Sequence, residues 1–413
     1  MKIFLIPLLF ALLPCGLPAQ EFSTGGMRPI TLGEACALSL AKSEQLAQQG
    51  EGIKQLEAAE RLLNAAFRPS FDLNASQYKQ QNSASVTRGY LSGSYSLFSG
   101  MRDYISQKAA AARTGAAQLD LARAGQQLYL GVAQAYLNLL AAQREVLIRG
   151  EQLDVTGKRI AELEARVDIG RSRKSEAVAV KTQLAQDKAS YLNAAAAERL
   201  AQQALMFLTG LDADLAPGGI SLSGEAALES YLKTALQRPD LAARRKSLEV
   251  TGYLLDVQDR NLWPTVTVSA NYYVVRHPLP DPVNRWDGNL AVNIPLYKGG
   301  AAQAQRQAAY SVKRAAVTAL QLAERQALTE VRSAYEELKY SALQAASLEE
   351  ALALASGNAL YQEEDYKLGL VTNLDVLSAL NTVQQTRLAL SQARVQEIWT
   401  LLKLKTAAGQ EIR

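Results

Sequence analysis

Two carboxylates stand at matching places in this chain. Glu176 comes six residues after Gly170, and Asp375 comes six residues after Gly369. The run from Thr372 to Asp375 has the spacing of a capping box, in which an acid accepts hydrogen bonds at the start of its helix. Glu176 falls in a predicted first helical turn, where the helix dipole favours an acid. Structural capping is therefore the first expectation for both acids, and it is compatible with a second role.

The chain offers little else for catalysis. It has one histidine, His277, in 413 residues, so acid–base or metal chemistry based on histidine is not expected. The sequence holds no clustered nucleophile, base or metal-ligand set, so we expect neither an enzyme nor a cofactor. The net charge of +4 is too small to indicate a nucleic-acid partner.

An internal duplication is the most informative feature of the sequence. Pro69 and Pro264, 195 positions apart, each close a helical pattern and open a strand-like one. Gly100 and Gly299, 199 positions apart, each mark the return from strand to helix. The offset of 199 also relates Val132 to Val331, Tyr136 to Tyr335, Leu139 to Leu338 and Gly170 to Gly369.

The duplication predicts two similar halves, each with the order helix, strand, strand, long helix, turn, helix. The first half is expected at 20–210, with a hairpin at about 70–98 and a turn at 170. A linker is expected at 211–223. The second half is expected at 224–413, with a hairpin at about 265–296 and a turn at 369. The four extra residues of the second half are expected in a longer loop between its strands.

Long helices dominate the expected fold. No proline interrupts the stretch from Met101 to about Val167 or the stretch from Ala301 to about Leu368, and apolar residues recur there at helical spacing. At 1.5 Å per residue, each helix could reach roughly 100 Å. Such helices joined by short turns favour an elongated, tubular or rod-like assembly, although periodicity alone also fits an ordinary helical bundle.

The strand patterns point to a membrane. From Thr265 to Val274 the residues alternate, with Val266, Val268 and Tyr272 on one face. Each run is about 10 residues long, which suits a tilted strand that crosses a bilayer. Four strands cannot close a barrel, since the smallest has about eight. Either several chains pool their strands, or the hairpins form a soluble sheet packed on the helices.

The first residues resemble a secretory signal peptide. Lys2 is followed by the apolar run Ile3 to Leu13 and a small residue at Ala19, so we expect residues 1–19 to be removed. Acylation of Cys15 is an alternative, although Pro14 directly before it suits a lipoprotein signal poorly. The mature chain keeps only Cys36, which is expected to be a small buried apolar side chain.

Taken together, these motifs resemble the TolC-type outer membrane factors over nearly the whole mature chain. The similarity rests on the duplicated order of elements and on the switches at Arg68-Pro69 and Trp263-Pro264 and at Gly100 and Gly299. It also rests on the segment from Tyr366 to Leu377.

The resemblance implies a homotrimer in the cell outer membrane. Three protomers would contribute four strands each to one 12-stranded transmembrane β-barrel, and their antiparallel helices would form an α-barrel in the periplasm. It also implies two protein partners, namely a periplasmic adaptor (membrane fusion protein) and an inner-membrane transporter of the RND or ABC type. The chain would then be the passive exit duct of an efflux or type I secretion system.

The same resemblance assigns roles to the turn residues. Gly170 and Arg171 in the first turn, and Gly369, Leu370, Val371 and Thr372 in the second, would contact the adaptor. Asp375, Glu176 and Tyr366 would form the periplasmic entrance and its gate, with three copies of each acid around the axis. The chain departs from the family pattern at Ser378 and Val371, where an acid and an arginine are usual, which implies a looser gate.

A second class of protein also fits the helical pattern. A periplasmic adaptor or scaffold with long helical hairpins would have the same periodicity and the same signal peptide without entering the membrane. Whether the strands enter the membrane distinguishes the two alternatives.

Overall fold

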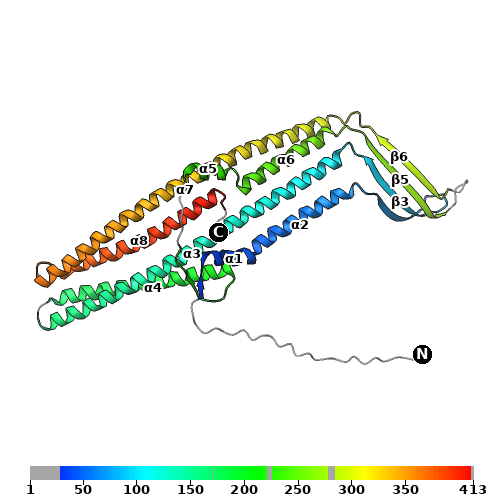
Figure 1. Cartoon of the computed structure of the whole chain (residues 1–413). Coiled ribbons are helices and arrows are strands. Elements are labelled where there is room, and N and C mark those ends of the chain that lie inside the picture. Colours follow the sequence, from blue (N-terminus) through cyan, green and yellow to red (C-terminus); the bar gives the residue numbers. More distant parts are fainter. Residues whose placement is uncertain (1–27, 171, 221–225, 278–283, 411–413) are drawn as a thin grey trace, which may run out of the picture.

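The elements form a long bundle of helices with a β-sheet at one end and, at the other, two tight turns that each connect one helix to the next (Figure 1). The structure is a computed structural model, and it describes residues 28–170, 172–220, 226–277 and 284–410. The expected signal peptide at 1–19, Cys15 and Arg171 lie outside the described residues. None of the helices within these ranges has an apolar stretch long enough to cross a membrane.

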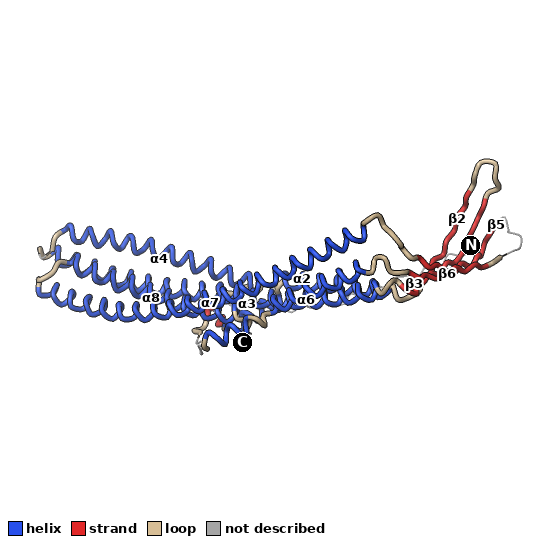
Figure 2. Tube along the Cα trace, turned by 90° about the horizontal axis from the view of Figure 1, so that it is seen from above, coloured by secondary structure: helices blue, strands red, loops and turns tan. Residues whose placement is uncertain are grey.

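The two longest helices match their predicted bounds closely. Helix α3 spans Arg102–Asp168 and α7 spans Ala301–Leu368. Each turns back into a shorter helix, α4 (Lys174–Thr209) and α8 (Asn373–Ala407), so that two helical hairpins lie along the same direction (Figures 1 and 2). The hairpins are tied together by an ion pair between Arg387 of α8 and Glu151 of α3.

The single helix expected before each strand pair is a pair of helices. In the first half, α1 (Leu32–Lys42) ends at Ser43, whose hydroxyl accepts from the Leu46 backbone N–H at 3.2 Å and so begins α2 (Glu44–Ala65). In the second half, α5 (Leu228–Ala235) is followed by α6 (Pro239–Asp259), where proline occupies the first turn. Proline is suited to that position because its missing N–H would have no helical partner there.

A short two-stranded sheet joins the two ends of the first half. Strand β1 (Arg28–Ile30) pairs in parallel with β4 (Leu215–Pro217). The hydroxyl of Tyr136, in α3, lies 2.9 Å from the Ile30 carbonyl oxygen and 3.0 Å from that of Gly218. Burial raises the pKa of this phenol, so it stays protonated and able to donate.

Two apolar clusters form the core at this level. The first surrounds Tyr136 and Leu137 and includes Cys36. Burial raises the pKa of the Cys36 thiol to about 12, so it stays a neutral, packed side chain, as expected from its apolar neighbours in the sequence. The second cluster packs Tyr231 of α5 against Val331 of α7 and Leu404 of α8.

The two hairpins of strands form one continuous sheet. Strands β2 (Ser70–Tyr78), β3 (Val86–Phe98), β5 (Thr265–His277) and β6 (Trp286–Asn293) lie in that order, and every neighbouring pair is antiparallel. The central pairing joins β3 to β5 and therefore the two halves of the chain. Strands β2 and β6 are the edges of this sheet.

The extra residues of the second half are not concentrated in its loop, contrary to expectation. The connection from His277 to Trp286 is only one residue longer than that from Tyr78 to Val86. Instead, β5 extends over 265–277, whereas β2 extends only over 70–78. The stretch from the start of β6 to α7, 286–300, is no longer than the stretch 86–101 in the first half. The added length therefore lies mainly in β5.

Each face of the sheet has its own chemistry. Cross-strand register places one set of side chains together, which we call the apolar face: Phe71, Leu73, Leu91, Tyr95, Val268, Tyr272, Trp286, Leu290 and Val292. The opposite set, the polar face, comprises Asp72, Asn74, Tyr90, Ser92, Ser94, Ser269, Asn271, Tyr273, Asp287 and Asn289. Hydrogen bonds cross the polar face, as from Asn74 Nδ2 to Ser92 Oγ at 2.8 Å.

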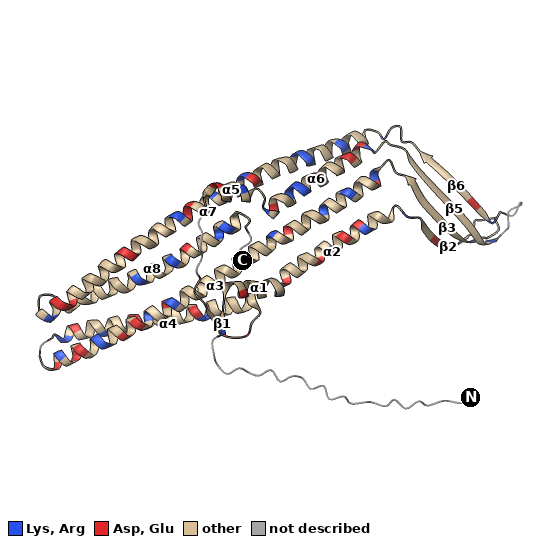
Figure 3. Ribbon diagram, in the orientation of Figure 1, with Lys and Arg blue, Asp and Glu red and all other residues tan. Residues whose placement is uncertain are grey.

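The apolar face is open to the surroundings in one protomer. Leu73 is 78% exposed and Leu290 is 62% exposed, and charged residues are sparse in the sheet compared with the helices (Figure 3). Alternation, predicted to run through Val274, is interrupted there by a β-bulge opposite Gly89 and Tyr90. Burial of the apolar face needs either lipid or another protein surface.

Candidate functional site at the helical turns

The end of the bundle far from the sheet carries the predicted gate and tip residues. Both turns lie there (Figure 1). Gly170 and Gly369 have φ angles of 74° and 78°, a left-handed conformation that glycine adopts without strain. The Gly369 backbone N–H donates to the Tyr366 carbonyl at 3.1 Å, which closes the last turn of α7.

The second turn presents apolar side chains. Leu368 is 74% exposed, Leu370 is 71% exposed and Leu374 is 69% exposed. In the first turn, Ile169 is similarly exposed, and Arg173 and Lys174 follow it on the surface. One turn is thus mainly apolar, whereas the described part of the other combines an apolar residue with two cations.

Asp375 caps its own helix. Its carboxylate accepts from the Thr372 backbone N–H at 2.8 Å and from the Thr372 hydroxyl at 2.6 Å. The hydrogen bond from the Thr372 hydroxyl holds the pKa of Asp375 below its usual range, and the hydrogen bond from the Thr372 backbone N–H adds a smaller contribution in the same direction. The acid is exposed and is ionised at neutral pH.

Glu176 also bonds within its own turn. The Ser172 hydroxyl donates to its carboxylate at 2.6 Å. Neither acid hydrogen-bonds to the other hairpin among the described residues, so one protomer does not join the two acids into one cluster. The capping role expected for Asp375 is present in the geometry, and a role of either acid in a pore stays a prediction.

Tyr366 lies in a cluster that connects the two hairpins. The guanidinium of Arg159, from α3, stacks 4.5 Å from the Tyr366 ring centroid, and that of Arg166 lies 4.9 Å from it. Arg159 Nε donates to Asn373 Oδ1 at 2.8 Å. Both Arg159 and Asn373 are buried, at 8% and 2% exposed. We call Arg159, Arg166, Tyr366 and Asn373 the hairpin link.

Charge in the hairpin link is only partly balanced. Glu162 pairs with Arg166 at 2.7 Å and more loosely with Arg159 at 3.5 Å. One terminal nitrogen of Arg159 is buried without a hydrogen-bond partner among the described residues. An incompletely satisfied buried guanidinium makes this contact between the hairpins weaker than one that is fully paired.

Sequence reasoning identified Tyr366 but missed its partners. Arg159 and Arg166 are seven residues apart, a spacing that places both on one face of α3 and could have identified them as a pair. Their meeting with Asn373 joins positions 214 apart and has no local signal.

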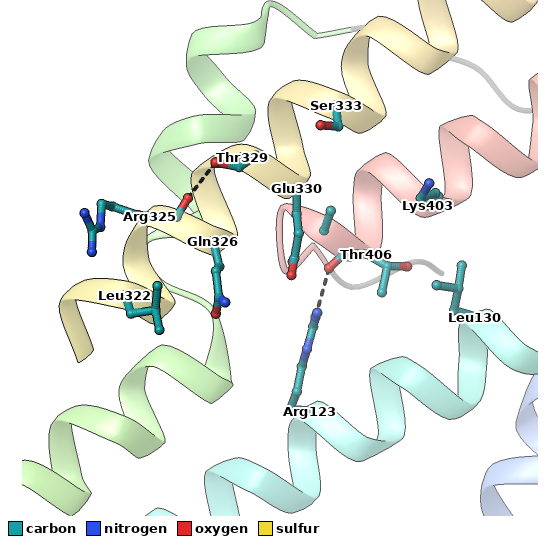
Figure 4. Close-up of a pocket in the computed structure, with 11 residues that line it drawn as sticks. Arg123, Leu130, Leu322, Arg325, Gln326, Thr329, Glu330, Ser333, Lys403 and Thr406 are labelled. Atoms are coloured by element: carbon teal, nitrogen blue, oxygen red, sulfur yellow. Dashed lines mark hydrogen bonds between the residues drawn. The ribbon is translucent and has the colours of Figure 1, made fainter. Parts of the chain in front are cut away.

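A large cavity lies elsewhere, about halfway along the bundle. It has a volume of about 760 Å³ and lies between α3, α7 and α8 (Figure 4). Arg123 reaches across it and donates to the Thr406 carbonyl at 2.9 Å, while the Thr329 hydroxyl donates to the Arg325 carbonyl at 2.9 Å. Glu330 at its wall pairs with Arg238 at 2.6 Å. These groups are engaged in structural bonds and do not form a nucleophile and base.

Comparison with known proteins extends these observations. Residues 231–410 match a family model described as outer membrane efflux protein. The outer membrane efflux protein BepC of Brucella suis biovar 1 (strain 1330) is 25% identical over 294 residues, which are 68% of this chain and 63% of that protein. The match therefore spans less than two thirds of that relative.

Solved structures share the fold over most of the chain. The outer membrane protein VceC of Vibrio cholerae superposes with a TM-score of 0.83 at 21% identity, covering 92% of this chain and 97% of that one. The CmeC outer membrane channel of Campylobacter jejuni gives a TM-score of 0.81 at 17% identity, covering 92% and 85%. The mainly helical fold and the resemblance to outer membrane efflux proteins, both inferred from sequence, are confirmed.

Proposed function

We propose that this chain, which resembles the outer membrane efflux proteins in sequence and in fold, is the exit duct of a tripartite efflux or type I secretion system. The duct conducts passively, and an inner-membrane transporter of the RND or ABC type supplies substrate and energy. The observation that carries the proposal is a four-stranded sheet with one apolar face and two open edges, mounted on helices of 67 and 68 residues.

The sheet supports a place in the outer membrane. Lipid would cover the apolar face, whereas the polar face would line water. Open edges are not tolerated in lipid because their backbone groups have no partners there. Three protomers, with β6 of each beside β2 of the next, would close a 12-stranded barrel, and the homotrimer removes every edge.

The helices support a tunnel in the periplasm. We propose that the two halves are structural repeats, 20–210 and 224–413, so that a trimer places six similar hairpins around its axis. Helices α3 and α7 could each reach roughly 100 Å at 1.5 Å per residue. The tunnel then ends at the two turns of each protomer.

The turns are the proposed contacts with the adaptor. The residues proposed for this contact are Gly170 and Arg171 in the first turn and Gly369 to Thr372 in the second. Exposure of Leu368 and Leu370 supports an apolar contact there, because large apolar side chains clustered on a surface commonly mark protein interfaces. The gate is proposed at Asp375, Glu176 and Tyr366, with the hairpin link holding it shut.

The membrane assignment is tested by fractionating cells that produce the full chain. We expect it in the outer-membrane fraction as a trimer that survives mild detergent without heating and becomes a monomer on boiling. A barrel with all strands paired resists detergent, whereas a peripheral helical scaffold does not. Release of the chain by a salt wash would instead support the adaptor or scaffold alternative.

The proposed entrance is tested by Asp375→Ala. Three ionised carboxylates around a narrow opening would attract cations, so the substitution should shift the reversal potential of the trimer in a salt gradient toward anions. Ser378→Ala, in the next turn of the same helix, is the matched control and should leave selectivity unchanged. Unaltered cation selectivity in Asp375→Ala trimers would remove this acid from the entrance.

A further inference from the structure

The polar face carries its strongest charge at the turn end of the sheet, the end farthest from the helices. There, cross-strand register places Arg88 directly opposite Arg276. One row nearer the helices, Tyr90 lies opposite Tyr273, with ring centroids 5.5 Å apart. The β-bulge in β5 brings Arg276 over the Tyr273 ring, at 4.5 Å from its centroid. One guanidinium thus lies over the paired phenol rings, and a second lies on the strand opposite it.

Directly opposed like charges normally destabilise a pair of strands. Arg88 and Arg276 form no ion pair within the described part of the chain, and the hydrogen bond recorded for Arg276 goes to the Asn284 carbonyl at 3.2 Å. Each guanidinium has five N–H donors, so most of this capacity is unused. Repulsion between the two guanidinium groups destabilises the sheet when no ligand is bound. An anion bound between the two groups would replace this repulsion with attraction.

The nearest acids on the polar face lie deeper. Asp72 and Asp287 belong to the row of Ser92 and Asn271, one row nearer the helices than the tyrosines. The Asp287 carboxylate accepts from Asn271 Nδ2 at 2.8 Å. The polar face is therefore layered, with arginines outermost, then tyrosines, then acids.

We propose that the arginine and tyrosine layers bind anionic aromatic molecules at the outer end of the duct. The inference rests on the proposed function, because three copies of the pair must surround one lumen. Guanidinium groups bind a carboxylate or phosphate with charge-assisted, often bidentate hydrogen bonds. The phenol rings add a stacking surface for an aromatic group. The site selects cargo as it leaves, at the opposite end from the carboxylates of the entrance.

The test uses purified trimers in planar bilayers, with phenyl phosphate and inorganic phosphate as probes added on the side of the sheet. We expect phenyl phosphate to reduce the chloride current at a concentration about ten-fold lower than inorganic phosphate does, since stacking adds to ion pairing. The double variant Arg88→Ser, Arg276→Ser should lose block by both probes and shift the reversal potential toward cations. Tyr273→Leu should keep block by inorganic phosphate and lose the preference for phenyl phosphate.

Controls separate this site from general charge effects and from the duct itself. Lys79→Ser removes a cation from the neighbouring turn and should change neither block nor selectivity. Arg88→Lys with Arg276→Lys keeps the charge and should retain selectivity while weakening block. Unchanged block and reversal potential in conducting Arg88→Ser, Arg276→Ser trimers would overturn the site and leave the duct standing.

Failure of the duct would look different. If the wild-type chain forms no conducting trimer, the proposed function falls and the anion site falls with it. If wild-type trimers conduct and neither phosphate probe blocks them, only the anion site is lost.

Discussion

Trimers of Arg159→Ala should open far more often than wild-type trimers. The substitution removes the hydrogen bond to Asn373 and the closer of the two guanidinium contacts with the Tyr366 ring, whereas the contact of Arg166 remains. It also leaves the buried Asn373 oxygen without its donor, at a cost of about 1–3 kcal/mol. A change of that size in a two-state gate shifts the ratio of open to closed channels about 5- to 150-fold.

Single-channel recording in planar bilayers measures this ratio directly. Arg149→Ala is the matched control, because Arg149 lies on the same helix and pairs with Glu145 within it, at 3.4 Å. Asn373→Asp should act in the opposite direction, since it turns the hydrogen bond with Arg159 into a buried ion pair at a helix start that favours an acid. An open probability that is the same in Arg159→Ala and wild-type trimers would exclude the hairpin link as a gate element.

Gly100→Ala should destabilise the junction between sheet and helices more than Gly299→Ala does. Both glycines have positive φ, 67° and 58°, so alanine costs roughly 1–2 kcal/mol at either position. Only at Gly100 would the new Cβ also collide, at 2.8 Å from the Trp263 Cβ, whereas nothing lies within 4 Å at Gly299. Relief of that overlap through shifts of packed atoms costs typically about 1–3 kcal/mol more.

The temperature at which trimers dissociate in detergent reports the difference. Gly100→Ala should dissociate at the lowest temperature, Gly299→Ala at an intermediate one and wild type at the highest. Because the collision involves the tryptophan Cβ itself, Trp263→Gly in the Gly100→Ala background should recover part of the loss, whereas Trp263→Ala should not. Equal dissociation temperatures for Gly100→Ala and Gly299→Ala would show that the junction yields without strain.

Local signals explain which parts of this fold could be predicted. Helices α3 and α7 follow from long runs without proline, and their ends follow from Gly170 and Gly369, because both features act on neighbouring residues. The strands follow from alternation, which is interrupted where a bulge adds a residue to β5 and again in β3 between Ser96 and Phe98. The capping role of Asp375 is local in the same way.

The remaining features depend on contacts between distant parts of the chain. The helix break at Ser43 could have been predicted from its capping side chain. This signal is weak, however, compared with the apolar periodicity that continues on both sides of Ser43. The pairing of β1 with β4 is too short to show alternation, and it depends on Tyr136 from a third element. In the sequence, nothing distinguishes Arg159 from an ordinary surface residue of a long helix. Only the fold brings Asn373 and Tyr366 beside it. Sequence therefore predicted the two turns between the helices without locating the contacts that join the hairpins there.

The β3–β5 pairing has a consequence for how the protein is made. Its register joins Thr87 to His277, so the four-stranded sheet cannot form until most of the chain has been synthesised. The hairpin of α3 and α4 joins neighbouring segments and can form first, because closing a short loop costs less entropy than closing a long one. During that interval the apolar side chains of β2 and β3 have no partners from the second half. If the chain is exported as proposed, the first hairpin of strands is thus the part of the sheet that a periplasmic chaperone would have to cover until the second half arrives.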